Sequence, residues 1–307
     1  MTDTLFPPPE PGAAKSGRGN DWRIDRDRAR AGGAGAIPSE ALEIVDETAS
    51  TNTDLMARMK ALPRERVALG VHAVRAAYRQ TAGRGRQGRS WQATPGHALT
   101  FSLACVLPRP LAGLAGLSLA TGVAVVDALA RLAPSEAARL QLKWPNDVLL
   151  DGRKLAGILI ETAWSTASAS AVVIGVGINV RRDEALEADL EAAASTMPAQ
   201  ARGTPPAALS QALPNANLTD TLAVVVKALT EMIERFGAQG FPAFVDRWNA
   251  YHAYANREVV LIEKGNEFAR GTATGVDGSG QLLLATAAGV RAIATGDVSL
   301  RLADDAS

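Results

Sequence analysis

Cysteine is nearly absent from this chain, and that absence limits the chemistry open to it. Cys105 is the single cysteine among 307 residues, which excludes an intrachain disulfide and a cysteine-ligated zinc site. No run of about 18 apolar residues occurs, which argues against a membrane span, and the N-terminus has no charged-then-apolar secretion signal. These absences predict a cytoplasmic protein with no membrane partner.

Acidic residues are absent from one long stretch, although charge is balanced over the whole chain. The 32 basic and 32 acidic residues cancel, so no bulk field recruits nucleic acid or a membrane surface. Between Arg66 and Val126 there is no Asp or Glu, whereas seven arginines occur there: Arg66, Arg75, Arg79, Arg84, Arg86, Arg89 and Arg109. This region is therefore predicted to bind an anion.

Apolar residues are sparse before residue 39, where Pro- and Gly-rich stretches flank a mixed-charge run. Such a composition buries too little apolar surface to offset the entropy of ordering, so residues 1–38 are predicted to form a disordered tail. In residues 39–255, apolar runs of strand length alternate with helical patterns, which predicts a sheet covered by helices. In residues 256–307, short β runs separated by glycine turns predict a small all-β barrel.

A loop rich in glycine and arginine, "GRGRQGR", lies at residues 83–89. Glycines let backbone N–H groups approach an anion closely, and arginines offer bidentate donors to carboxylate or phosphate. The loop lacks the "GK[ST]" ending of a Walker loop, and no helix clearly starts there as in a dinucleotide fingerprint. By itself, however, such a loop is more typical of a solvated or RNA-binding segment, and that alternative stays open.

Four further motifs combine polar residues with structural signals. "TASTN" (48–52) is either a helix N-cap or a set of hydrogen-bonding groups for a neutral polar ring. "KWPND" (143–147) places a lysine and an aspartate around a Trp-Pro turn. Lys154 heads an apolar strand, where a lysine usually only extends towards solvent. "GVGINV" (175–180) places two glycines where a strand must admit a close neighbour, and an asparagine follows.

Taken in order, five motifs resemble those of the biotin protein ligases: "STN", "QTAGRGRQGRSW", "KWPNDVLLDGRKLAGIL", "GVGIN" and a terminal "GDVSLR". The resemblance runs from about Leu42 to Arg301. It implies an α+β fold, with a mixed-sheet catalytic domain flanked by helices and a C-terminal SH3-like barrel. It also implies an enzyme that activates biotin with ATP as biotinyl-5′-AMP and transfers it to a lysine of a biotin carboxyl carrier protein, such as that of acetyl-CoA carboxylase.

The resemblance also carries roles onto matching residues. The catalytic cations would be Lys154, Arg86 and Arg84. The biotin site would contain Ser50, Thr51, Asn52, Gln80, Arg84, Gly85, Arg86, Lys154, Gly157, Gly175 and Gly177, with the last three glycines keeping the biotin tunnel open. The ATP site would contain Arg86, Arg89, Trp91, Lys154, Asn179 and Arg301. Mg²⁺ would accompany ATP, and Asn179 would touch the nucleotide or its metal; no dedicated metal site is assigned.

Two departures from the family pattern and two alternatives accompany these expectations. The segment before the catalytic domain lacks the pattern of a helix-turn-helix, so no specific DNA binding is expected, and a homodimer is left open. After "GIN" there is no tryptophan to cover adenine, so that cover is expected to differ. A related lipoate ligase is the nearest alternative. The other alternative is a non-enzymatic RNA-binding protein, although only Tyr78 and Trp91 supply aromatic rings near the loop.

Overall fold

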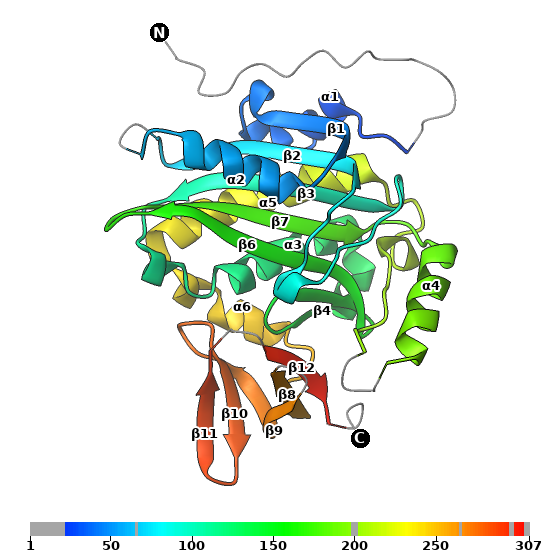
Figure 1. The fold of residues 1–307 in the computed structure, drawn as a ribbon, viewed down its shortest axis with the longest axis vertical. Coiled ribbons are helices and arrows are strands. Elements are labelled where there is room, and N and C mark those ends of the chain that lie inside the picture. The colour runs from blue at the N-terminus through cyan, green and yellow to red at the C-terminus, as the bar shows by residue number, and fades with distance from the viewer. Residues whose placement is uncertain (1–21, 65–66, 198–201, 264–265, 295–297, 304–307) are drawn as a thin grey trace.

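A seven-stranded sheet forms the centre of the protein in the computed structural model (Figure 1). The structure describes residues 22–64, 67–197, 202–263, 266–294 and 298–303. Its strand order is β1-β2-β3-β7-β6-β5-β4. The first pair is parallel and the others are antiparallel, which confirms the predicted mixed sheet. The strands are β1 (Leu42–Thr48), β2 (Gly70–Gln80), β3 (Ala98–Leu107), β4 (Leu140–Lys143), β5 (Asp147–Leu150), β6 (Arg153–Ser165) and β7 (Ser170–Asn179).

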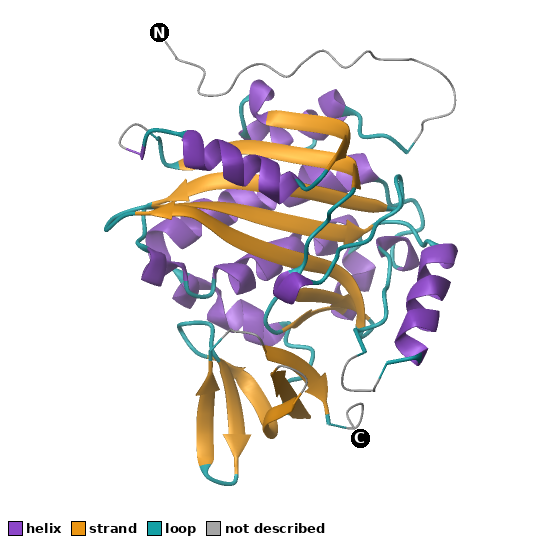
Figure 2. Ribbon diagram, in the orientation of Figure 1, coloured by secondary structure: helices purple, strands orange, loops and turns teal. Residues whose placement is uncertain are grey.

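Helices cover both faces of this sheet (Figure 2). Helix α2 (Thr51–Ala61) packs on one face against β3, β6 and β7, while α3 (Leu117–Leu132) and α5 (Leu218–Gln239) pack together on the other. All ten residues of β3 are buried because both its faces are covered. The described residues also form the helices α1 (Arg26–Ala31), α4 (Glu184–Ser195) and α6 (Val245–Ala250).

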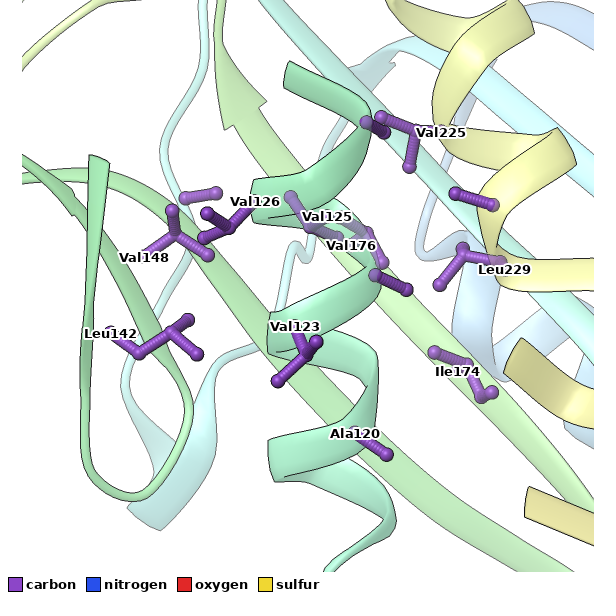
Figure 3. Close-up of a cluster of buried hydrophobic side chains, with 14 of the residues drawn as sticks. Ala120, Val123, Val125, Val126, Leu142, Val148, Ile174, Val176, Val225 and Leu229 are labelled. Carbon is purple, nitrogen blue, oxygen red and sulfur yellow. The ribbon is translucent and has the colours of Figure 1, made fainter. Parts of the chain in front are cut away.

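The main core lies between the sheet and the α3–α5 pair. Figure 3 shows Val123, Val125 and Val126 of α3 among side chains from β4, β5, β7 and α5. The stretch Leu111–Leu132, which includes α3, is long and apolar enough to cross a membrane by length and composition alone. Most of α3 is buried against the sheet and α5, however, as expected of a core helix.

The C-terminal residues form a second, smaller sheet with strand order β11-β10-β9-β8-β12, all antiparallel. Its strands are β8 (Glu258–Glu263), β9 (Asn266–Val276), β10 (Leu282–Thr286), β11 (Gly289–Ile293) and β12 (Val298–Leu302). This agrees with the predicted small β unit, and the predicted division after residue 255 falls in the turn between α6 and β8. The Trp144 indole donates to the Gly280 carbonyl and ties this unit to the larger one.

Residues 22–38 fold against α5, so the prediction of a disordered tail is wrong for them; residues 1–21 lie outside the described part of the chain. Asp25 caps α1, and Ala29, Ala34 and Ile37 are buried. Small residues allow this close packing: a Cβ on Gly33 would lie 3.0 Å from the Lys227 Cβ. The composition shows few apolar residues here, but it does not show that a complementary helix surface receives them.

Candidate functional site

All the predicted site residues except Asn179 line one cavity of about 150 Å³, the first cavity. They arrive from separate elements: the N-terminus of α2, the end of β2, the loop before β3, and the strands β6, β7 and β12. Strand register accounts for part of this gathering. Gly177 of β7 pairs with Gly157 of β6 on one side and with Thr100 of β3 on the other. Residues in register on neighbouring strands face the same side of the sheet, so these three positions lie on the face that lines the cavity.

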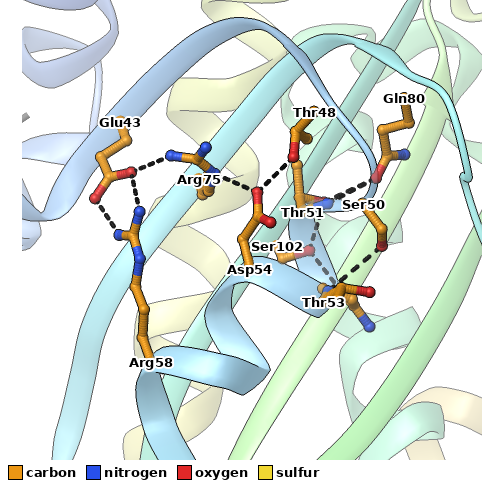
Figure 4. Close-up of polar contacts among 11 residues, drawn as sticks. Glu43, Thr48, Ser50, Thr51, Thr53, Asp54, Arg58, Arg75, Gln80 and Ser102 are labelled. Carbon is orange, nitrogen blue, oxygen red and sulfur yellow. Dashed lines mark hydrogen bonds and ion pairs between the residues drawn. The ribbon is translucent and has the colours of Figure 1, made fainter. Parts of the chain in front are cut away.

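A polar cluster of Ser50, Thr51, Asn52 and Ser102 lines part of the first cavity, and Figure 4 shows Ser50, Thr51 and Ser102 of this cluster beside Gln80. The Ser50 hydroxyl accepts from the Thr53 amide and caps α2, so the N-cap expectation is confirmed. The Thr51 amide donates to Gln80 Oε1 at 2.9 Å, and the Thr51 and Ser102 hydroxyls lie 2.7 Å apart. Because these four side chains are at most 4% exposed, the cluster is rigid as well as polar.

Asn52 connects the polar cluster to the arginine loop, residues 83–91. It accepts from the Ser102 hydroxyl and donates from Nδ2 to Glu161 Oε2 at 2.8 Å. The same Glu161 oxygen accepts from Arg84 Nη2 at 2.8 Å. Glu161, which the sequence interpretation overlooked, therefore joins the fixed cluster to the loop. Its one signal was a carboxylate on the same strand face as Gly157.

An ion-pair network lies behind the polar cluster (Figure 4). Arg75 pairs with both Glu43 and Asp54, and Arg58 pairs with Glu43. Burial acts to raise the pKa of Glu43, but the bonds from Arg58 and Arg75 outweigh it and hold that pKa below its usual value. The network braces the start of α2 from outside the cavity.

Several arginines of the acid-free stretch face away from the first cavity. Arg75 belongs to the ion-pair network, Arg79 pairs with Glu47, and Arg109 donates to the Phe236 carbonyl at the end of α5. Arg66 lies outside the described residues. Within the described part, the anion-binding prediction is thereby narrowed to the three arginines of the loop, Arg84, Arg86 and Arg89, which all line the cavity.

The arginine loop, residues 83–91, closes on itself. The Gly85 amide donates to the Arg89 carbonyl at 2.7 Å, and the Trp91 amide donates to the Gly83 carbonyl at 2.9 Å. The turn between them contains Gln87 at φ 58° and Gly88 at φ 70°, a left-handed conformation that costs a non-glycine residue free energy. Arg86 Nη1 reaches Asn146 Oδ1 at 3.4 Å.

Lys154 and Asp147, which also line the first cavity, form an ion pair with Nζ 2.7 Å from Oδ1. Lys143 lies beside them, is 4% exposed, and donates to the Thr204 hydroxyl at 2.7 Å. Burial lowers the pKa of Lys143 to about 7, helped by the cations Arg301, Lys154 and Arg89 and opposed by Asp147. The "KWPND" motif by itself indicated no role for these residues, because nothing in the local sequence shows that Lys143 is buried.

Gly157, Gly175 and Gly177 were expected to keep a tunnel open. In the structure, each of them also leaves room for a particular side chain. A Cβ on Gly175 would lie 2.4 Å from Asn52 Oδ1, and one on Gly177 would lie 2.4 Å from Trp91 Cε2. A Cβ on Gly157 would lie 3.1 Å from Trp91 Cζ3. The Trp91 indole therefore packs against two neighbouring strands, and its buried Nε1 has no hydrogen-bond partner among the described residues.

A second cavity, of about 220 Å³, lies beyond Trp91 and is lined by Asn179. Ser90, Trp91 and Lys154 line both cavities and so form the wall between them. Asn179 Nδ2 donates to the Ala207 carbonyl at 3.0 Å and holds the segment 204–208 along the cavity. Leu186, Glu187 and Leu190 of α4 also line this cavity, and the segment 203–213, part of which lines it, has no tryptophan.

Comparison with known proteins places this geometry in a family. Residues 49–179 match the Biotin/lipoate A/B protein ligase family, and residues 254–301 match the biotin protein ligase C-terminal domain. The chain is 35% identical over 224 residues to the biotin–[acetyl-CoA-carboxylase] ligase of Paracoccus denitrificans, which covers 71% of this chain and 86% of that protein.

Two further comparisons agree. The chain is 33% identical over 225 residues to the bifunctional ligase/repressor BirA of Escherichia coli (strain K12), covering 73% of this chain and 65%, or just under two thirds, of that protein's length. A biotin protein ligase from Aquifex aeolicus, solved in complex with biotin and ATP, superposes with a TM-score of 0.65 at 26% identity, over 86% of this chain and 100% of the other. From its motifs, its two-cavity site and these likenesses, the chain belongs to the biotin protein ligase family.

Proposed function

We propose that this protein is an ATP-dependent biotin–[biotin carboxyl carrier protein] ligase. The observation that carries the proposal is the meeting of two cavities at Lys154 and Trp91, one with a buried neutral polar end and the other lined by Asn179. Two adjoining pockets can hold two substrates side by side, and a cation where they meet lowers the repulsion between two anionic reactants. Biotin would occupy the first cavity and the nucleoside of ATP the second.

The polar cluster suits the uncharged ureido ring of biotin. Such a ring presents both N–H donors and a carbonyl acceptor, and hydroxyl and amide groups match both. Because the cluster is already hydrogen-bonded and buried, its groups lose little freedom when the ring binds. Ser50, Thr51, Asn52 and Gln80 are therefore assigned to this end of biotin.

The cations suit the first chemical step. A biotin carboxylate oxygen attacks the α-phosphorus of ATP, the bond between the α-phosphorus and the bridging oxygen breaks, and pyrophosphate leaves. Both reactants are anions, so their repulsion must be offset where they meet. Lys154, oriented by Asp147, lies at that junction, and Arg84, Arg86, Arg89 and Arg301 line the same first cavity. In the second step a carrier lysine attacks the acyl carbon, an amide forms and AMP leaves.

The residues present also fit Mg²⁺ bound largely through ATP. Among the described residues that line the first cavity, Asp147 is the one carboxylate, and no group of three or more His, Cys, Asp or Glu side chains is close enough to hold an ion by itself. Mg²⁺ commonly takes one or two carboxylates and completes its shell with phosphates and water. Asp147 would hold the ion, which neutralises phosphate charge when bound.

The partner and setting follow from the same proposal. The acceptor is a lysine of a biotin carboxyl carrier domain, and the reaction takes place in the cytoplasm. The absence of specific DNA binding stays a prediction, to be tested by a mobility shift with biotin and ATP present. A homodimer is likewise a prediction, which sedimentation at several protein concentrations would check.

The decisive experiment measures pyrophosphate release and label transfer to an apo carrier domain, with biotin or lipoate as the acid. We expect ATP-dependent release and transfer with biotin and at most a small fraction of either with lipoate. Preference for lipoate would replace the biotin ligase by a lipoate ligase. Activity with neither acid, together with salt-sensitive RNA binding, would favour the non-enzymatic alternative.

A further inference from the structure

The segment Trp22–Pro38 precedes the family match at residues 49–179, and its first described residue packs behind the site. The Trp22 and Tyr78 rings meet edge to face, with centroids 5.0 Å apart and planes at 85°. A Cβ on Gly96 would lie 3.0 Å from Trp22 Cδ2, so the indole rests directly on the Gly96 backbone. The Arg23 guanidinium carbon lies 4.6 Å from the Tyr78 ring centroid.

Independent contacts hold this segment in place. The Ile24 amide donates to the Tyr78 hydroxyl at 2.9 Å, and the Asp25 amide donates to Thr219 Oγ1 at 3.0 Å. Arg28 pairs with Asp220 near the start of α5. The segment is thus attached to the body of the protein by contacts that do not include Trp22, and the indole is pressed against Gly96.

The residue next to Gly96 belongs to the second cavity. The His97 carbonyl accepts from the Val180 amide at 2.8 Å and from the Arg181 amide at 2.9 Å, and His97 Nδ1 lies 2.8 Å from the Arg182 carbonyl. His97 and Arg181 themselves line the second cavity, as does Asn179. One side of the turn at 94–97 therefore supports the cavity edge, while the other side rests on Trp22.

We propose that Trp22 is a positioning residue for the nucleotide half of the site. It touches neither cavity; it acts by fixing Gly96 and hence the hydrogen bonds of His97 to residues 180–182. Gly96 has φ 85°, a left-handed conformation that favours glycine. Because glycine has no side chain to pack, the Trp22 indole supplies the contact that holds this position. This inference rests on the proposed assignment of ATP to the second cavity.

The test separates KM for ATP from KM for biotin in the pyrophosphate-release assay. Trp22→Ala should raise KM for ATP about tenfold, because the nucleotide must then order the edge it binds, while KM for biotin changes less than twofold. Trp22→Phe should restore most of the ATP affinity. Arg28→Ala removes an exposed anchor of the same segment away from Gly96, and should leave both values within twofold.

A second variant approaches from the other side and does not depend on how well Trp22→Ala folds. Gly96→Ala places a methyl group against the indole and should also raise KM for ATP selectively. Gly289→Ala is its control, because Gly289, at the start of β11, has φ 110° with nothing within 4 Å of its Cβ position. Equal rises in both KM values, or an unchanged KM for ATP in Trp22→Ala or Gly96→Ala, would overturn the inference. Failure of the wild-type protein to release pyrophosphate would instead overturn the proposed function.

Discussion

The polar cluster and the arginine loop line the same cavity but are built in opposite ways. In the cluster, every side chain is at most 4% exposed and hydrogen-bonded to its neighbours. In the loop, the Arg84 side chain is 45% exposed, and the turn includes a non-glycine residue at positive φ. A neutral ring is recognised by fixed donors and acceptors, whereas two anions that arrive and leave require cations on a backbone that can open and close.

This contrast has an energetic side. Removing one member of a buried hydrogen-bonded group leaves its partners unsatisfied, at a cost of about 1–3 kcal/mol to folding. Removing an exposed arginine costs about 0–1 kcal/mol, because its ion pair is screened by water. Substitutions in the polar cluster should therefore lower stability and biotin binding together, whereas substitutions in the loop should lower function alone.

The largest effect is expected at Lys154, where the two cavities meet. Lys154→Ala should reduce biotinyl-AMP formation at least about a hundredfold, since one cation against a carboxylate and a phosphate contributes on the order of 3 kcal/mol. Stability should fall less, because the ion pair with Asp147 is partly exposed. Single-turnover formation of the adenylate measures the effect. Arg139→Ala, which removes an exposed cation paired with Asp151, is the control; a near wild-type rate for Lys154→Ala would mean that Lys154 only extends towards solvent.

The next largest effect is expected from a substitution in the polar cluster, which should lower both stability and biotin affinity. Asn52→Ala removes one hydrogen bond from Ser102 and one from Glu161, which keep Thr51 and Arg84 as partners, and is expected to lower stability by about 2 kcal/mol and biotin affinity by roughly thirtyfold. Urea unfolding and equilibrium biotin binding would be compared with Thr53→Ala, the adjacent exposed position. A loss of stability at unchanged biotin affinity would show that the cluster braces α2 without touching biotin.

In the arginine loop, Arg86→Gly should separate retention of the intermediate from its formation. The lost charge-assisted contact, worth about 1.5–3 kcal/mol, should raise the escape rate of biotinyl-AMP about tenfold or more. Adenylation should persist because Lys154, Arg84 and Arg89 remain. Biotin appearing on albumin, added as a bystander, reports escape, and Arg79→Gly, outside the cavity, is the control. Negligible albumin labelling by an Arg86→Gly enzyme that still adenylates would refute this role.

The smallest effect concerns the protonation of Lys143. Its pKa is about 7 in the folded protein and near 10.5 when unfolded, so the folded state binds fewer protons between these values. Stability contributed by this group therefore rises as pH increases from 7 to 10.5, and below pH 7 the cost of burying the charge is fully present.

If phosphate pairs with charged Lys143, ATP affinity should fall about fivefold from pH 7 to pH 8 as the lysine loses its proton. Calorimetry at pH 8 in buffers of different ionisation enthalpy should then report proton uptake on binding. Lys143→Met should abolish both the uptake and this part of the pH dependence. Identical uptake in the wild type and Lys143→Met would place the titrating group elsewhere.

Particular residues show how far sequence patterns could lead. The apolar runs and glycine turns predicted the helix-covered sheet and the small β unit, because burial imposes its period on the chain directly. The motifs named most of the cavity lining. They gave no role to Lys143 and did not indicate Glu161 or the packing of Trp22. These features depend on strand register and on which parts of the folded chain pack against each other.

The sequence by itself determined which chemical groups are available: three arginines on a glycine backbone, a capped helix with hydroxyl and amide groups, and a lysine at the head of an apolar strand. Tertiary structure alone decided their use. Register across β3, β7 and β6 brought Gly175, Gly177 and Gly157 under Asn52 and Trp91, and burial lowered the pKa of Lys143. Contacts between residues distant in the chain have no local signature, because their free energy depends on surfaces that exist only after folding.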